Sequence, residues 1–174
     1  MRPVRYSVAA SLDGFITDAS GGYDWIPHDP AVDFAALFER VDTVLMGRRT
    51  WETVQAAGGG PGWPPRTRVY VFSRTLQPDQ QADVRIVAAD ATATVAALRA
   101  EPGDGEIWLF GGSHLFGSLL AAGQVDRVEV TVVPILLGRG TPLVSPSIAA
   151  TPLTLTGMHR YPTGMVTLSY DVRR

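Results

Sequence analysis

The stretch from residue 107 to residue 123 constrains the fold most, because it places a pair of glycines between a buried strand and a helix. Four apolar residues at 107–110 have the pattern of a buried strand, which Gly111 and Gly112 end. Apolar residues then recur at helical spacing until Gly123, which is typical of a helix C-cap. Such a junction leaves backbone N–H groups open at the helix N-terminus. The stretch is therefore either a tight turn or a binding site for an anionic group such as a pyrophosphate.

Two further strand ends repeat this arrangement and add basic side chains to it. Short apolar strands are predicted at 43–46 and 68–72. The residues that follow them are Gly47, Arg48, Arg49 and Thr50 after the first strand, and Ser73 and Arg74 after the second. The planar guanidinium of Arg suits bidentate recognition of phosphate. Solvated arginines on loops would explain either segment alone, but the repetition favours phosphate binding.

Strand and helix patterns alternate along the chain. Strands are predicted at 4–11, 43–46, 68–72, 84–87, 107–110, 128–133, 153–158 and 165–172, and helices at 30–40, at 92–100, and directly after Gly47 and Gly112. Asp29 and Pro30 are typical of an N-cap and a first helical position, so they set the start of helix 30–40. The strand at 128–133 is placed near a sheet edge. Together these patterns predict one domain over 1–174, an α/β fold with a mixed, mainly parallel sheet, flanking helices and a C-terminal antiparallel hairpin.

The composition excludes several classes of function. All 15 basic residues other than histidine are Arg, so neither a Schiff-base lysine nor a P-loop lysine is present. The chain contains no Cys, and its three histidines stand far apart without the spacing of metal ligands. A formal net charge of −2 argues against nucleic-acid binding. No apolar run reaches the ~20 residues of a membrane span, and a cytoplasmic location is expected.

The glycine pair differs from the usual dinucleotide fingerprint. Ser113 stands where G-x-G-x-x-G requires its second glycine, and no acidic residue follows at the position that would bind a ribose. An ordinary Rossmann dehydrogenase is therefore disfavoured. Arg48, Arg49 and Arg74 can neutralise a 2′-phosphate, which favours NADPH over NADH.

Five motifs in succession resemble one family. Residues 44–52 resemble the cofactor-binding segment of dihydrofolate reductases, and 72–74 and 109–113 match its second and third cofactor segments in order and spacing. Residues 9–14 and 133–143 resemble the RibD C-terminal branch of that superfamily, the bacterial pyrimidine reductases of riboflavin synthesis and their stand-alone relatives. The resemblance covers nearly the whole chain. It implies a dihydrofolate reductase-like fold, NADPH as the cofactor, and a homodimer.

The resemblance also implies roles for individual residues. Gly47, Arg48, Arg49 and Thr50 would hold the phosphates, and Ser73 and Arg74 the adenosine 2′-phosphate. Gly111, Gly112 and Ser113 would meet the pyrophosphate, with a cis peptide between the two glycines, and Ala10 and Ile16 would flank the nicotinamide. Phe110 and Leu115 complete the expected cofactor site. No metal is expected.

The expected reaction is hydride transfer from the nicotinamide to a C=N or C=O of a small heterocycle, either an aminopyrimidine of riboflavin synthesis or a dihydropterin. Dihydrofolate reductases carry a substrate-binding carboxylate on their first long helix, and Asp33 is the nearest match, so it is the candidate catalytic residue. Asp29 is also within reach, and Asp13 is the alternative that would face the substrate. Trp25 resembles the tryptophan beside the folate site. The loops at 17–30 and 56–66 would shape the substrate pocket.

Two other functions fit parts of the sequence. A reductase fold that keeps NADPH without a proton donor would be a binding module. The segment 111–115 also comes close to the G-x-S-x-G elbow of serine hydrolases, with Ser113 as nucleophile and His159 as base, although Leu115 replaces the last glycine.

Overall fold

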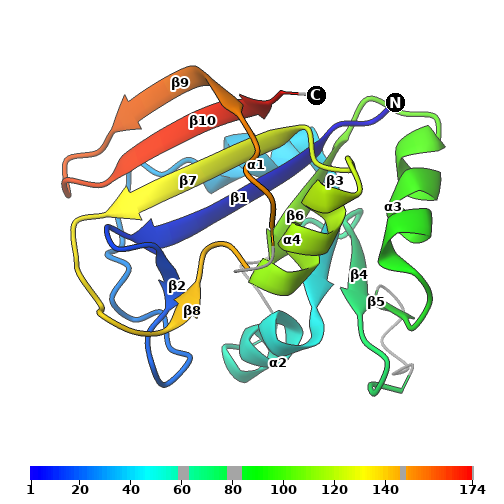
Figure 1. Cartoon of the computed structure of the whole chain (residues 1–174), viewed down its shortest axis with the longest axis horizontal. Helices are drawn as coiled ribbons and strands as arrows, with labels where there is room; N and C mark the ends of the chain where they lie inside the picture. Colours follow the sequence, from blue (N-terminus) through cyan, green and yellow to red (C-terminus); the bar gives the residue numbers. More distant parts are fainter. Residues whose placement is uncertain (59–62, 78–83, 146–147, 174) are drawn as a thin grey trace.

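A computed structural model describes residues 1–58, 63–77, 84–145 and 148–173. Its centre is an eight-stranded sheet in the order β5-β4-β3-β6-β1-β7-β10-β9 (Figure 1). The strands are β1 Val4–Ser11, β3 Val41–Gly47, β4 Arg68–Phe72, β5 Val84–Val87, β6 Glu106–Gly111, β7 Arg127–Val133, β9 Leu153–Arg160 and β10 Val166–Val172. The neighbours from β5 to β7 pair in parallel, and β10 pairs antiparallel with both β7 and β9. The predicted mixed, mainly parallel sheet with its C-terminal hairpin is confirmed.

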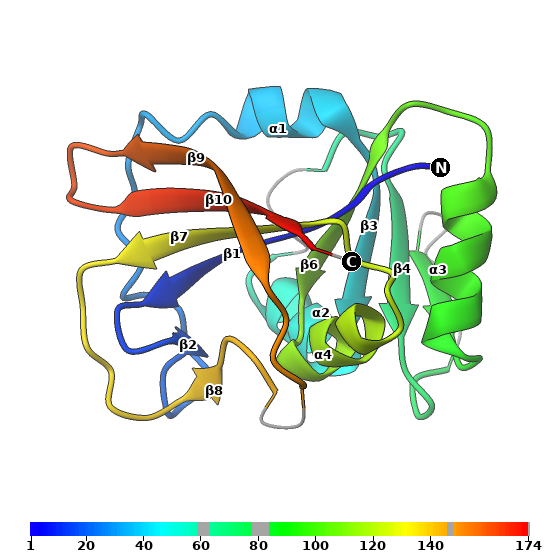
Figure 2. The same cartoon turned by 45° about the horizontal axis from the view of Figure 1, so that its top comes forward.

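Helices cover the sheet on both faces. They are α1 Phe34–Arg40, α2 Arg48–Ala56, α3 Ala91–Ala100 and α4 Ser113–Ala121, and a two-stranded sheet of β2 Phe15–Thr17 and β8 Thr141–Pro142 lies beside the end of β1. Figures 1 and 2 show α1 and α4 on opposite sides of the sheet. No helix among the described ranges is long and apolar enough to span a membrane.

Two apolar cores form because the strands alternate their side chains between the faces. On one face Tyr6 and Leu109 pack with Val95 of α3 and Phe116 of α4. The rings of Tyr6 and Phe116 stack, with their centroids 3.9 Å apart. The second core lies on the opposite face, where Trp108 packs with apolar residues of β3, β4, α1 and α2.

The first helix begins later than its sequence pattern predicts. The predicted start at 30 is wrong, because Asp33 is the N-cap and α1 begins at Phe34. The carboxylate of Asp29 instead accepts hydrogen bonds from the Ala31 N–H at 2.9 Å and from the Thr163 hydroxyl at 2.7 Å. These bonds hold the chain in a non-helical turn against the β9–β10 connection.

The strand β7 lies inside the sheet, so its predicted place near an edge is wrong. It pairs with β1 on one side and with β10 on the other. Its alternation has a different cause. Val128 packs in the first core, whereas Glu129 and Thr131 point to a cleft on the opposite face.

Candidate functional site

Two glycine turns lie side by side at the carboxyl ends of β3 and β6. The strands pair in parallel with Met46 opposite Gly111, so the turns into α2 and α4 are neighbours. A Cβ added to Gly111 would lie 3.1 Å from Cγ2 and 3.2 Å from Oγ1 of Thr50. The N-caps of the two helices are Gly47 and Gly112, and no side chain caps either helix. The open N–H groups of two helices therefore converge where an anion can bind both.

The carboxyl end of β4 lies next to these turns. The hydroxyl of Ser73 accepts hydrogen bonds from the N–H of Leu76 at 2.9 Å and of Thr75 at 3.2 Å, which folds the chain after the strand. Arg49 and Arg74 are exposed, and neither guanidinium has a hydrogen bond or ion pair among the described residues. Both are therefore available to an anionic ligand.

The three strand ends open into one cleft of about 2580 Å³. Pockets for one small ligand usually measure about 300–1,000 Å³, so this cleft has room for an extended cofactor and a second molecule. Most of the residues predicted for the site line it: Ile16, Asp33, Gly47, Arg48, Arg49, Thr50, Ser73, Arg74, Phe110, Gly111, Gly112, Ser113 and Leu115. Ala10, Asp13 and Trp25 are not among its lining residues.

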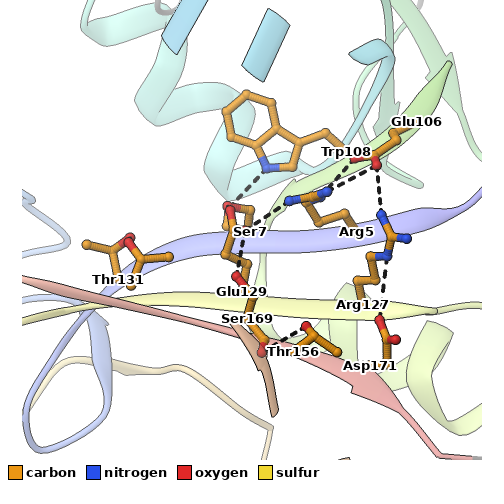
Figure 3. A network of polar contacts seen from close by, with 11 residues as sticks. Arg5, Ser7, Glu106, Trp108, Arg127, Glu129, Thr131, Thr156, Ser169 and Asp171 are labelled. Carbon is orange, nitrogen blue, oxygen red and sulfur yellow. Dashed lines mark hydrogen bonds and ion pairs between the residues drawn. The ribbon is translucent and has the colours of Figure 1, made fainter. Parts of the chain in front are cut away.

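The cleft continues away from the glycine turns across β1, β7 and β10. There its bottom is formed by five polar side chains, which we call the polar floor: Ser7, Glu129, Thr131, Thr167 and Ser169. Figure 3 shows the central carboxylate, Glu129, which accepts hydrogen bonds from Ser7 at 2.9 Å, from Arg5 at 2.9 Å and from Ser169 at 3.0 Å. Arg5 also donates to both carboxylate oxygens of Glu106, at 2.8 and 3.0 Å.

Comparison with known proteins shows which family has this sequence and fold. The chain matches the RibD C-terminal domain family over residues 2–167. It belongs to this family. YwjB, an uncharacterised protein of Bacillus subtilis (strain 168), is 31% identical over 158 residues, which cover 88% of this chain and 89% of that protein.

Crystal structures of other proteins have the same fold. A protein from Shewanella sp. PV-4 whose name places it in riboflavin biosynthesis matches with a TM-score of 0.84 and 30% identity over 100% of both chains. The Thermotoga maritima diaminohydroxyphosphoribosylaminopyrimidine deaminase/5-amino-6-(5-phosphoribosylamino)uracil reductase matches with a TM-score of 0.68 at 19% identity, over 99% of this chain and 57% of that one. This last likeness is evidence for the fold alone.

Strand register explains why one expected cofactor residue of this RibD-type chain lies outside the cleft. Ala10 is 1% exposed and alternates in step with Tyr6, which packs in the first core. Its neighbour Ala9 lines the cleft together with Ser7. A shift of one residue along a strand reverses the face of the side chain, so Ala9 is the small residue of β1 that a flat ligand can approach.

The proposed substrate residues Asp13 and Trp25 have local partners. Asp13 accepts hydrogen bonds from the Leu137 N–H at 3.1 Å and the Gly138 N–H at 2.7 Å, which fastens the loop after β7. The Ser11 hydroxyl, followed by these N–H groups, holds the pKa of Asp13 below its ordinary value. The indole of Trp25 donates to the Gly22 carbonyl at 3.2 Å.

Asp33 and Asp29 differ in their access to the cleft. Asp33 is exposed, lines the cleft and accepts a hydrogen bond from the Ala36 N–H at 2.9 Å. Asp29 is 5% exposed, and the Thr163 hydroxyl, followed by the Ala31 N–H, holds its pKa below its ordinary value. Asp33 is thus the more accessible carboxylate, whereas Asp29 supports the loop before α1.

Two further expectations concern the glycine turn. The peptide expected to be cis between Gly111 and Gly112 is trans, as are all peptides in the part of the chain that the structure describes. Gly112 instead adopts a φ of +97°, which favours glycine. The side chain of Ser113 is buried at the start of α4 and has no hydrogen bond to a histidine among the described residues, so nothing there activates it as a nucleophile.

The polar floor was missed at the sequence level, although β7 and β10 carry a signal for it. Both strands alternate apolar with polar residues, and the polar set includes Glu129, Thr131, Thr167 and Ser169. Alternation alone cannot distinguish a solvent-facing side of a sheet from the floor of a cleft. Of the predicted pocket loop 56–66, residues 59–62 lie outside the described residues.

Proposed function

We propose that this protein is an NADPH-dependent reductase that transfers hydride to a C=N or C=O of a small heterocycle. The observation that carries the proposal is the pair of adjacent, uncapped helix N-termini at Gly47 and Gly112, with Arg49 and Arg74 available beside them. Membership of the RibD C-terminal domain family supports the same chemistry.

The residues of the cleft fit the chemistry of NADPH. The N–H groups at the starts of α2 and α4 would bind the pyrophosphate, because glycine lets the ligand approach the backbone closely. Arg74, with Arg49 and the hydroxyl of Ser73, would hold the 2′-phosphate through charge-assisted hydrogen bonds. Ile16 and Ala9 would form apolar contacts with the nicotinamide. When bound, the cofactor would supply the hydride.

The proton that accompanies the hydride is assigned to Asp33. Its exposed carboxylate lines the cleft on the α1 side, and the hydrogen bond from Ala36 N–H fixes its position. A carboxylate held in this way can relay a proton through one water molecule to the heterocycle.

The substrate class is proposed from the relatives. The Thermotoga maritima structural neighbour is named as a reductase of 5-amino-6-(5-phosphoribosylamino)uracil, so an aminopyrimidine of this kind is the first candidate and a dihydropterin the second. The test is to measure the binding of NADPH and NADH, followed by NADPH oxidation with each compound. We expect tight binding of NADPH, weaker binding of NADH, and turnover with an aminopyrimidine.

Two results would contradict this proposal. Equal affinity for the two cofactors, or no binding of either, would refute the NADPH site. Binding of NADPH without oxidation on a panel of pyrimidines and pterins would favour the non-catalytic module instead.

We also propose that the protein is a homodimer that uses the outer face of the hairpin. Leu153, Leu155 and Met158 of the edge strand β9 are 37%, 56% and 72% exposed. Their partners in β10 are Val172, Tyr170 and Leu168, so all six side chains lie on the face opposite the polar floor. An exposed edge strand beside an apolar face is suited to pairing with a second copy of the same surface.

A further inference from the structure

The polar floor carries more information about the substrate than the glycine turns do. It forms the bottom of the cleft beyond the cofactor turns, and it is built from β1, β7 and β10 (Figure 3). Any molecule that fills this part of the cleft must be complementary to the hydrogen-bonding groups that the floor presents. This inference rests on the proposed function.

The floor is poor in hydrogen-bond donors. The hydroxyl protons of Ser7 and Ser169 are both donated to Glu129, so these two hydroxyls can only accept from a ligand. The hydroxyls of Thr131 and Thr167 lie 2.7 Å apart and share one hydrogen bond, which leaves one proton between them. Among the described residues, Oε1 of Glu129 accepts a hydrogen bond from Ser7 alone, so it retains an acceptor position.

The charged network beside the floor, on the same face of the sheet, also favours an uncharged ligand over an anion. The carboxylates of Glu106, Glu129 and Asp171 surround the guanidiniums of Arg5 and Arg127, so this network carries one net negative charge. The Arg5 side chain is 7% exposed and is occupied by Glu106 and Glu129. Its positive charge is therefore neutralised by these two carboxylates and does not attract a ligand.

The arginines that line the cleft lie elsewhere, and the basic side chain beside the floor is the imidazole of His159, the cross-strand partner of Thr167. Arg48, Arg49 and Arg74 belong to the cofactor turns, and Arg40 and Arg139 lie at the end of α1 and in the loop after β7. A phosphate dianion offers only acceptors and a negative charge, so the floor repels it and has almost no donor for it. Amino and hydroxyl groups of a neutral ligand match the floor.

We propose that the polar floor binds the amino and hydroxyl groups of an uncharged heterocyclic substrate. The protein then takes the dephosphorylated form of an aminopyrimidine riboside in preference to its phosphate ester.

The test compares two compounds on the protein loaded with NADP⁺. The affinities of 5-amino-6-(ribosylamino)uracil and of its 5-phosphoribosyl counterpart are measured by calorimetry, and NADPH oxidation is measured with each. We expect the uncharged compound to bind at least about tenfold more tightly than the phosphate ester. The loss of one hydrogen bond to a charged group commonly changes affinity by this amount.

Three variants test whether the polar floor causes the preference for the uncharged compound over the phosphate ester. Glu129→Gln replaces one acceptor oxygen by a donor, so it should weaken binding of the uncharged compound about tenfold and narrow the preference. Thr131→Val removes a hydroxyl at nearly constant shape and should weaken binding to a lesser extent, which keeps the test decisive if Glu129→Gln fails to fold. Glu39→Gln changes an exposed carboxylate outside the cleft and should alter neither affinity. NADPH affinity reports whether each variant has folded.

The outcomes separate the two proposals. NADPH binding together with equal or tighter binding of the phosphate ester would overturn this inference and leave the reductase proposal standing. Absence of NADPH binding would refute the reductase proposal itself. If the NADP⁺-loaded protein binds neither compound, the substrate class proposed for the floor is wrong.

Discussion

Gly111 lies directly against Thr50, across the boundary between β6 and the first turn of α2. A Cβ at position 111 would come within 3.1 Å of Thr50 Cγ2, a tight contact that requires Thr50 to shift by a few tenths of an ångström. This contact joins the two glycine turns, so the spacing of their N–H groups depends on the absence of a side chain at Gly111. The geometry of the proposed cofactor site therefore depends on a packing contact between neighbouring strand ends.

Gly111→Ala should therefore weaken NADPH binding about tenfold, because the methyl group must displace Thr50 in the first turn of α2. Thr50→Ala removes both close atoms, so the double variant should recover part of the lost affinity. Fluorescence titration with NADPH measures each variant. The matched control is Gly157→Ala, where an added Cβ comes no closer than 3.7 Å to Ser169. Independent, additive effects of the two substitutions would contradict the steric explanation.

Arg74→Ala should reduce NADPH affinity about tenfold to a hundredfold and leave NADH affinity unchanged, because the guanidinium is proposed to bind only the 2′-phosphate. The exposed Arg66, which lies outside the cleft lining, supplies the control substitution Arg66→Ala. Equal losses for NADPH and NADH in Arg74→Ala would show that the residue acts on the fold or on a shared part of the cofactor.

Two roles of Asp33 can be separated by substitution. Asp33→Ser keeps a side-chain N-cap for α1 and removes the carboxylate, so stability should be retained while kcat falls about a hundredfold. Asp33→Ala removes both and should also cost about 1 kcal/mol of the free energy of unfolding. Urea unfolding and steady-state NADPH oxidation measure the two effects. Full kcat in Asp33→Ser would leave Asp33 with the capping role alone.

The hydrogen bonds of Asp29 predict that the stability of the protein decreases when this carboxylate is protonated in acid. Its pKa is lower in the folded protein than the unfolded value of about 3.9, because the Thr163 hydroxyl and the Ala31 N–H stabilise the carboxylate. The stabilisation is therefore present above about pH 4 and is lost as the pH falls through the folded pKa.

Thermal unfolding between pH 6 and pH 3 measures this effect, at about half-unit steps around the unfolded pKa. The melting temperature of the wild type should fall more steeply with acidification than that of Asp29→Asn. The exposed Asp104, which has no hydrogen bond among the described residues, gives the control Asp104→Asn, whose profile should parallel the wild type. Parallel profiles for Asp29→Asn and wild type would refute the assignment.

Met158→Asp should convert the proposed homodimer into a monomer, because it places a charge within the apolar face of β9. Thr154→Asp on the same strand is the control, since Thr154 pairs with Asp171 on the opposite face. Size-exclusion chromatography with light scattering gives the mass of each. A wild-type protein of 18.7 kDa in solution would contradict the dimer.

Much of the fold could be predicted because its signals are local. The bounds predicted for β1, β4 and β5 agree with the structure, and the glycine turns fall where the apolar runs end. A buried run interrupted by glycine needs no distant partner to be recognised. The predicted start of α1 at residue 30 is wrong because it depends on a contact that is distant in the sequence. The capping signal at Asp29 is real, but its carboxylate is engaged by Thr163, 134 residues away.

Local patterns along the chain are sufficient to predict the α/β class, the strand ends that carry glycine and arginine, and the family that these motifs resemble. Which side chains share a surface depends on how the strands are assembled. This assembly places Ala9 rather than Ala10 in the cleft, puts β7 in the interior of the sheet, and joins Arg5 to Glu106 across 101 residues. Strand order and register fix these contacts, and neither is encoded in the periodicity of one segment.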